Sequence, residues 1–193
     1  MKTSEAIDTA LLLAGEDPKL SLWDEDDGNE GCSIRQRMLL DIEACAAEAI
    51  LDTPPMQLTG WKQLDGNALT IEDDGRAILP LPDDFLTLFS IKMTGWQKSV
   101  TELMPHDHWL RGMQSAYWPG LRGTPERPLA FMGVGTDGKP CIELFSCPAP
   151  DSLEEGWYMP APKIDADGNI DIPPAAYRKC LLLLARNIPT TLS

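Results

Sequence analysis

Residues 129–147, LAFMGVGTDGKPCIELFSC, contain two apolar runs that flank a short polar stretch. The runs at 129–134 and 141–147 have the length and composition of β-strands. Between them, Asp137-Gly138 is a pair that readily takes the positive φ angles of a tight turn. The loop lacks the Gly-Lys-Ser/Thr ending of a phosphate-binding loop. The stretch therefore predicts an antiparallel β-hairpin.

The same pattern extends upstream through the middle of the chain. Short apolar runs at 77–79 and 86–93 are preceded by turn signals, Asp65-Gly66-Asn67 and Asp73-Asp74-Gly75. The chain contains 17 prolines, many of them at the edges of these runs, where a β-layer tolerates them. We expect a β-rich region over residues 61–172.

Helical periodicity is found on both sides of this region. Apolar residues recur at helical spacing over 4–14, and a second helix begins at Ser33 and ends before Pro54. Its apolar residues follow at intervals of four, four, three and four: Ile34, Met38, Ile42, Cys45 and Ala49. A last helix starts at Pro173-Pro174, because proline favours the first helical position, and stops near Asn187.

Helices at both ends of the chain with strands between them predict an α+β fold. We expect a helical layer built from the N- and C-terminal helices, with an antiparallel β-rich region inserted between them. The expected parts are an N-terminal helical part over 1–60, the β-rich region over 61–172, and a C-terminal helix with a short tail over 173–193.

The composition is that of a folded acidic protein. The formal net charge is −14, and residues 1–54 hold 13 acidic and 4 basic side chains. This charge argues against the basic surface of a protein that grips nucleic-acid phosphates. The five cysteines form no Cys-x-x-Cys pair, and their odd number, with Cys45 and Cys180 on apolar helical faces, favours a reducing compartment. The N-terminus predicts no secretory signal, and the apolar run at 180–185 is too short to span a membrane.

Candidate chemical motifs are few. His106 and His108 could supply two metal ligands, but a site needs more, and we interpret 105–108 as a polar loop. The segment 165–171 is similar to a calcium loop, yet its glycine and closing acid do not have EF-hand spacing, so a turn is expected. No nucleophile–base pattern is found. We therefore expect no catalytic residue, metal or cofactor, and no enzyme activity.

The middle of the chain is rich in tryptophan: Trp61, Trp96, Trp109, Trp118 and Trp157. Such rings could be stacking platforms of a carbohydrate-binding β-module. They could equally be packing residues and interface anchors, and then they need no ligand.

Several motifs, taken in order, resemble tailed-phage head-to-tail connector adaptor proteins, the tail tubular protein A or head-completion type. They are Leu81-Pro82-Asp83-Asp84-Phe85-Leu86, then Ser90 through Gly95-Trp96, then Arg122-Gly123-Thr124-Pro125 with Arg127-Pro128-Leu129-Ala130, and the hairpin 133–145. The opening helix with its Gly15-Glu16 step, the second helix and the closing helix at 175–186 are similar to the same plan. The acidic stretch 23–31 has no place in it.

The resemblance implies a structural virion protein, assembled in the host cytoplasm. Its copies would form a ring between the portal protein and a tail or stopper protein, and DNA would pass through the lumen without specific binding. The interface candidates are Trp109, Trp118, Arg178, Arg186, Ile188 and Leu192, and the channel-lining candidates are Asp24, Asp26 and Asp27. The alternatives are a carbohydrate-binding or other tail-associated β-module without catalysis, and a small hydrolase.

Overall fold

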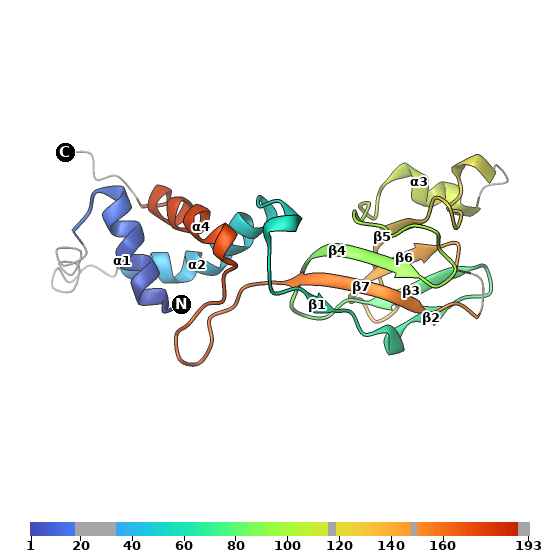
Figure 1. Ribbon diagram of the computed structural model, residues 1–193, viewed down its shortest axis with the longest axis horizontal. Coiled ribbons are helices and arrows are strands. Elements are labelled where there is room, and N and C mark those ends of the chain that lie inside the picture. Colours follow the sequence, from blue (N-terminus) through green and yellow to red (C-terminus); the bar gives the residue numbers. More distant parts are fainter. Residues whose placement is uncertain (18–33, 116–118, 148–149, 189–193) are drawn as a thin grey trace. The chain divides into compact units, whose positions relative to one another are not determined.

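The computed structural model describes residues 1–17, 34–115, 119–147 and 150–188. Helices and two antiparallel sheets confirm the α+β class (Figure 1). The chain divides into two compact units. We call Met1–Gly60 with Ala161–Ser193 the helical unit, and Trp61–Pro160 the β unit. Both ends of the chain thus belong to one unit, and the other is an insertion.

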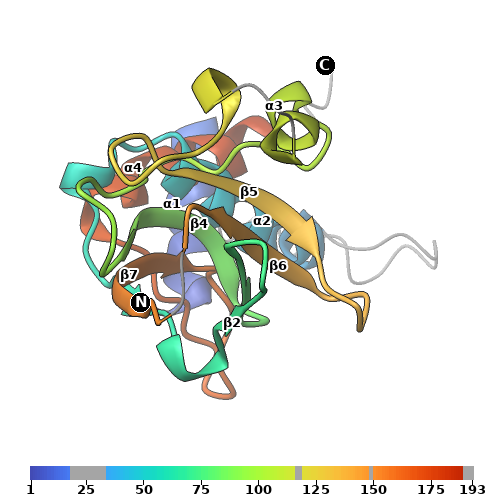
Figure 2. The ribbon, with the colours of Figure 1, turned by 90° about the vertical axis from the view of Figure 1, so that its right-hand side faces the viewer.

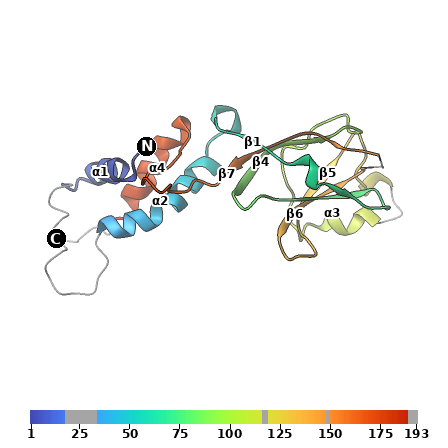
Figure 3. The ribbon, with the colours of Figure 1, turned by 90° about the horizontal axis from the view of Figure 1, so that it is seen from below.

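Three helices make up most of the helical unit: α1 (Thr3–Ala14), α2 (Ile34–Leu51) and α4 (Pro174–Arg186). Each contacts the other two, and α2 and α4 lie alongside each other (Figure 3). A short 3-10 turn, η2 (Pro55–Gln57), follows α2. The three predicted helices are confirmed, with ends one or two residues from those expected.

The ends of α1 and α4 follow from backbone chemistry. Gly15 takes φ 84°, and its N–H satisfies carbonyls of the last turn of α1. Pro174 occupies the first position of α4, where a missing N–H costs nothing. The predicted capping residue of α2, Ser33, lies outside the described residues.

The β unit contains two sheets in which every strand pair is antiparallel (Figure 2). One has the order β1-β7-β4, with β1 (Lys62–Gln63), β7 (Leu153–Pro160) and β4 (Phe85–Met93). The other has the order β2-β3-β6-β5, with β2 (Thr70–Ile71), β3 (Arg76–Pro80), β6 (Pro140–Phe145) and β5 (Leu129–Val134). The predicted hairpin at 129–147 is the β5–β6 pair.

One hydrophobic core is shared by the two sheets. Ala77, Leu79 and Ile142 come from the four-stranded sheet, and Ile91 and Tyr158 come from the other. Short helical segments complete the unit: η3 (Gly66–Ala68), α3 (Trp109–Gly112), η4 (Met113–Ser115) and η5 (Pro119–Leu121).

Residues 161–172 belong to the helical unit and not to the β-rich region, so the expected boundary at 172 lies twelve residues too late. A turn over 165–169 presents the carbonyl of Gly168 to the N–H of Thr3 at 3.0 Å. The N–H of Ile164 donates to Glu43 Oε1 of α2 at 2.7 Å. These bonds tie the segment to α1 and α2.

Candidate functional site

The motif residues at 81–86 join three strands of one sheet. The carboxylate of Asp84 accepts hydrogen bonds from Lys62 Nζ of β1 at 2.7 Å and from the hydroxyl of Tyr158 of β7 at 2.9 Å. The Lys62 bond lowers the pKa of Asp84, while burial and the bond to Asp84 raise the pKa of Tyr158 to about 12. Asp84 therefore fixes the start of β4 against its neighbours.

The Gly95-Trp96 step is a tight turn that leaves little room for a larger first residue. Gly95 N–H donates to Asp151 Oδ1 at 2.9 Å, and a Cβ at Gly95 would lie 3.1 Å from Asp151 Oδ2. The indole of Trp96 is buried in the core and donates to the carbonyl of Ser146 at 2.9 Å. Ser146 itself has φ 71°, a left-handed backbone that is uncommon for serine.

The segment 122–130 begins with a turn that is hydrogen-bonded to the residue after the Gly95-Trp96 step. Thr124 and Arg127 exchange backbone hydrogen bonds of 3.1 and 2.9 Å. The N–H of Gln97 donates to the carbonyl of Pro125 at 2.8 Å. Two motifs that are far apart in the sequence, the Gly95-Trp96 step and the segment 122–130, thus meet in the β unit.

A pocket of about 630 Å³ opens beside these motifs. Its lining comes from the β2–β3 turn, from α3 and η4, from 122–125, and from the end of β6. Among the lining residues are Arg76, Arg111, Arg122, Glu143 and Ser146. A second pocket, of about 670 Å³, is lined by motif residues at 81–86, but the first pocket holds the arginines and the buried glutamate and is the first candidate for a site.

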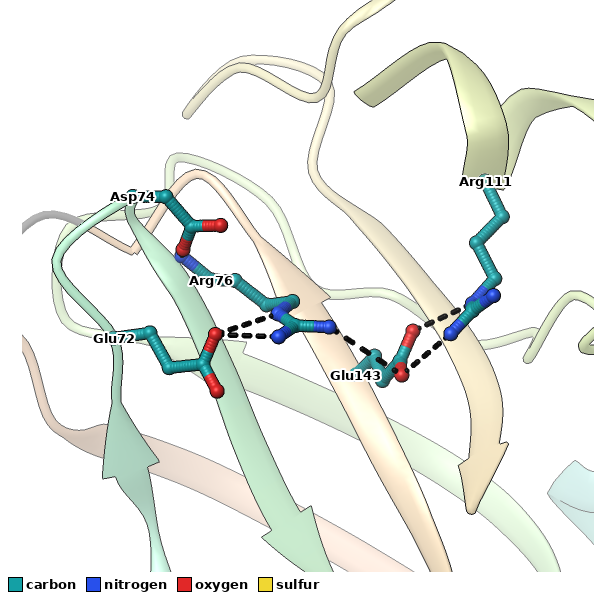
Figure 4. A network of polar contacts seen from close by, with 5 residues as sticks. All are labelled: Glu72, Asp74, Arg76, Arg111 and Glu143. Atoms are coloured by element: carbon teal, nitrogen blue, oxygen red, sulfur yellow. Dashed lines mark hydrogen bonds and ion pairs between the residues drawn. The ribbon is translucent and has the colours of Figure 1, made fainter. Parts of the chain in front are cut away.

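An ion-pair network forms one wall of the pocket (Figure 4). Arg111 of α3 grips Glu143 of β6 with two hydrogen bonds, Nε–Oε2 at 2.7 Å and Nη2–Oε1 at 2.8 Å. Arg76 Nη1 lies 3.8 Å from Glu143 Oε1, and its Nε donates to Glu72 at 2.9 Å. Asp74 accepts from the backbone N–H of Arg76 at 3.0 Å.

Glu143 is the buried centre of this network. Its side chain is only 5% exposed, and the hydrogen bonds from Arg111 hold its pKa below the usual range for a glutamate. A carboxylate held in this way stays ionised and does not serve as a general acid near neutral pH. The wall therefore links α3 to the four-stranded sheet.

Arg122 lines the same pocket and is exposed. Within the described ranges its guanidinium has no ion pair, while the other two arginines are paired with carboxylates. The charges of the wall are thus largely balanced among themselves. Among its described lining residues the pocket offers arginine donors, and none of its serines or its cysteine is hydrogen-bonded to a base.

The predicted interface residues differ in their exposure. Trp109 on α3 is 61% exposed, and Arg178 and Arg186 are exposed on α4. The expectation for Ile188 is wrong, because its side chain is buried and lies beside Met38 around a small pocket of the helical unit. The other candidates, Trp118, Leu192, Asp24, Asp26 and Asp27, lie outside the described residues.

The two histidines lie in the loop before and at the start of α3. His108 Nδ1 accepts the N–H of Leu110 at 3.3 Å, and its ring is 6.2 Å from that of Phe131. Within the described ranges, no group of three or more His, Cys, Asp or Glu residues could hold a metal ion. No described helix is long and apolar enough to cross a membrane.

Three of the four tryptophans that the structure describes are not free platforms. Trp61 packs against Phe89 with ring centroids 4.6 Å apart, Trp96 is buried, and Trp157 is half-buried. A stacking surface needs an exposed ring face. Trp109 is the one exposed residue among these four, and its ring stacks with that of His108 at 5.9 Å, so no aligned set of exposed rings favours carbohydrate binding in this part of the chain.

Exposed aliphatic side chains of the helical unit are the feature that sequence reasoning missed. They are Leu12, Leu13, Leu39, Leu40, Leu51, Met56 and Leu182. The sequence of α2 does indicate such a surface, because apolar residues also recur outside the stripe that packs into the core. Their outward direction depends on which face the partner helices cover.

The sequence matches no family model, and no curated protein matches it.

Proposed function

We propose that this chain is a structural virion protein, a subunit of the adaptor ring that joins the portal of a tailed phage to its tail. The order of the motifs from 81–86 through the hairpin 133–145 supports this proposal. The chain would assemble in the host cytoplasm, beneath a filled head, with neighbouring copies and a tail or stopper protein as its further partners.

The observation that carries the proposal is the exposed aliphatic surface of the helical unit. Leu40 is 76% exposed and Met56 is 86% exposed, and five other leucines of this unit are exposed with them. Scattered exposed leucines are normal, but this number in one small helical unit is typical of a surface that becomes buried in an assembly. A ring subunit needs such surfaces on its sides.

The motif residues give a second line of support. Asp84, Gly95 and Trp96 make hydrogen bonds or close packing contacts that hold the β unit together. Residues of this kind define a scaffold rather than a reaction. A resemblance carried by scaffold residues favours a shared architecture and a structural role.

The charge of the chain suits a channel for DNA. A net charge of −14 repels the phosphate backbone, so that DNA slides and does not adhere. For Asp24, Asp26 and Asp27, replacement of all three by asparagine should slow DNA ejection from assembled particles. Ejection at the wild-type rate would contradict the assignment of this acidic stretch to the channel lining.

Electron microscopy of the chain mixed with the portal encoded by the same genome tests the proposal. We expect an additional ring on one end of the portal, with the rotational symmetry of the contact between copies. The portal without the chain is the control. A portal that stays bare at saturating concentrations of the chain would contradict the proposed function.

A further inference from the structure

Helix α2 has two apolar faces, and one of them has no partner within the described residues. Met38, Ile42 and Cys45 are buried on the inner face. The outer face carries Leu40, Ala44, Ala47 and Leu51, at intervals of four, three and four. Leu40 is 76% and Leu51 is 56% exposed. This spacing is that of a seam which receives a second helix.

The outer face of α2 has an acidic border. Asp41 and Glu48 are exposed. They are seven residues apart, which corresponds to about 10 Å along the helix axis. Neither side chain forms an ion pair within the described ranges. Arg37 lies at the N-terminal end of the same border, and Asp52 at its other end is paired with Lys179 at 2.6 Å. Within the described ranges the border therefore keeps two exposed carboxylates without an ion pair, Glu48 and Asp41, and Asp41 also lines the small pocket beside Arg37 and Ile188.

The outer face of α4 is basic, whereas the border of α2 is acidic. Arg178, Leu182 and Arg186 follow at intervals of four and are all exposed. The two arginines are eight residues apart, about 12 Å along the helix, and Leu182 lies midway between them. Neither arginine has an ion-pair partner in the part of the chain that the structure describes.

We propose that the outer face of α4 in one copy binds the outer face of α2 in the next copy. Leu182 would pack over the small side chains of Ala44 and Ala47, between Leu40 and Leu51. This is the knobs-into-holes packing of two helices. Arg178 and Arg186 would then pair with Asp41 and Glu48, whose spacing nearly matches theirs. The inference rests on the proposed function in one respect, that copies of the chain lie side by side.

The contact joins two different surfaces, so in a bound pair one copy keeps a free α2 face and the other keeps a free α4 face. Such head-to-tail contacts propagate, and they close into a ring when the rotation between copies permits it. A dimer that placed α2 against α2 would instead bring two acidic borders together, and they would repel each other. Charge complementarity thus selects the α4 face of a second copy as the occupant of the α2 face, and in a ring this contact runs head to tail.

Cysteine trapping tests the contact directly. Two full-length variants, Leu182→Cys with an added mass tag and Ala44→Cys without one, are mixed and oxidised. We expect a mixed disulfide-linked dimer in large excess over each variant alone. Leu12→Cys on α1, an exposed leucine outside both faces, is the matched control for Leu182→Cys. A yield of mixed dimer equal to that of the control would overturn the proposal.

Charge reversal provides an independent test. The pair Asp41→Arg with Glu48→Arg, and the pair Arg178→Glu with Arg186→Glu, should each lower self-association in sedimentation velocity at least tenfold. A chain with all four changes carries both faces reversed and should associate again. Thermal unfolding of each variant checks the fold. Failure of a folded four-change chain to regain association would contradict the pairing.

The same variants separate this inference from the proposed function. If the wild-type chain forms a ring on the portal and both charge-reversed pairs still do so, the portal function stands and the α2–α4 contact is wrong. If the portal stays bare while Leu182→Cys and Ala44→Cys form their mixed dimer, the contact stands and the connector function is wrong.

Discussion

The guanidinium of Arg111 and the carboxylate of Glu143 meet side by side, with two nearly equal hydrogen bonds of 2.7 and 2.8 Å. Arg111 belongs to a one-turn helix that is too short to be stable alone. Glu143 faces it from a central strand of the four-stranded sheet. The pair thus determines where α3, and with it the exposed Trp109, lies in the β unit.

Replacement of Arg111 by methionine should destabilise the β unit. Glu143 would keep only Arg76, 3.8 Å away, as a charge partner, and a buried carboxylate without its main partner costs about 2 to 4 kcal/mol. Urea unfolding followed by tryptophan fluorescence measures this loss. Arg122→Met, an exposed arginine of the same pocket, should change the free energy of unfolding by less than about 0.5 kcal/mol. Equal effects would contradict the assigned role of the pair.

The contribution of Glu143 should depend on pH in a defined direction. Its pKa is lowered in the folded protein, so its ionised form stabilises the fold above the unfolded pKa of about 4.3. That stability is lost as the pH falls through the folded pKa. The difference in unfolding free energy between wild type and Glu143→Gln should therefore be large at pH 7 and shrink toward pH 3. A difference independent of pH would show that the charge is not involved.

Gly133→Ala should strain the same network from the neighbouring strand. A Cβ at Gly133 would lie 2.8 Å from Cγ of Glu143 and 3.0 Å from Sγ of Cys141, and Arg111 prevents the glutamate from moving away. We expect a loss of about 1 to 3 kcal/mol in calorimetry. Gly112→Ala, where a Cβ would meet nothing within 4 Å, is the control and should be neutral or stabilising. In a double-mutant cycle, Gly133→Ala should cost less in the Glu143→Ala background.

Tyr158→Phe should remove one hydrogen bond to Asp84 and cost about 1 kcal/mol in urea unfolding. The pKa of Tyr158 is raised to about 12, so folding favours the protonated phenol, and this contribution fades as the pH rises from the unfolded value of about 10 toward 12. Wild-type stability should therefore fall more steeply than that of Tyr158→Phe over this interval. Tyr177→Phe on α4, whose hydroxyl has no hydrogen bond within the described residues, should leave both measurements unchanged.

Local sequence patterns were sufficient for much of the secondary structure. The Asp137-Gly138 pair forces a reversal, and the apolar runs on either side of it supply paired strands. Glycine or proline at the ends of α1 and α4 marks their limits through backbone geometry alone. Such signals act over a few residues, so they are present in the sequence without knowledge of the fold.

Strand β7 was missed because Glu154, Glu155 and Gly156 interrupt any alternation of polar and apolar residues. It forms because it lies between β4 and β1, which satisfy its backbone groups on both sides. The place of 161–172 in the helical unit depends in the same way on partners far away in the chain, such as Thr3 and Glu43.

The sequence by itself determined the α+β class, the hairpin and the three long helices, because helical periodicity and turn chemistry are local. Only the tertiary structure decided that Ile188 is buried while Leu40 and Leu182 are exposed. It also brought Arg111 to Glu143 across 32 residues. Burial and charge pairing depend on which elements pack together, and that choice is made by the whole core rather than by any one segment.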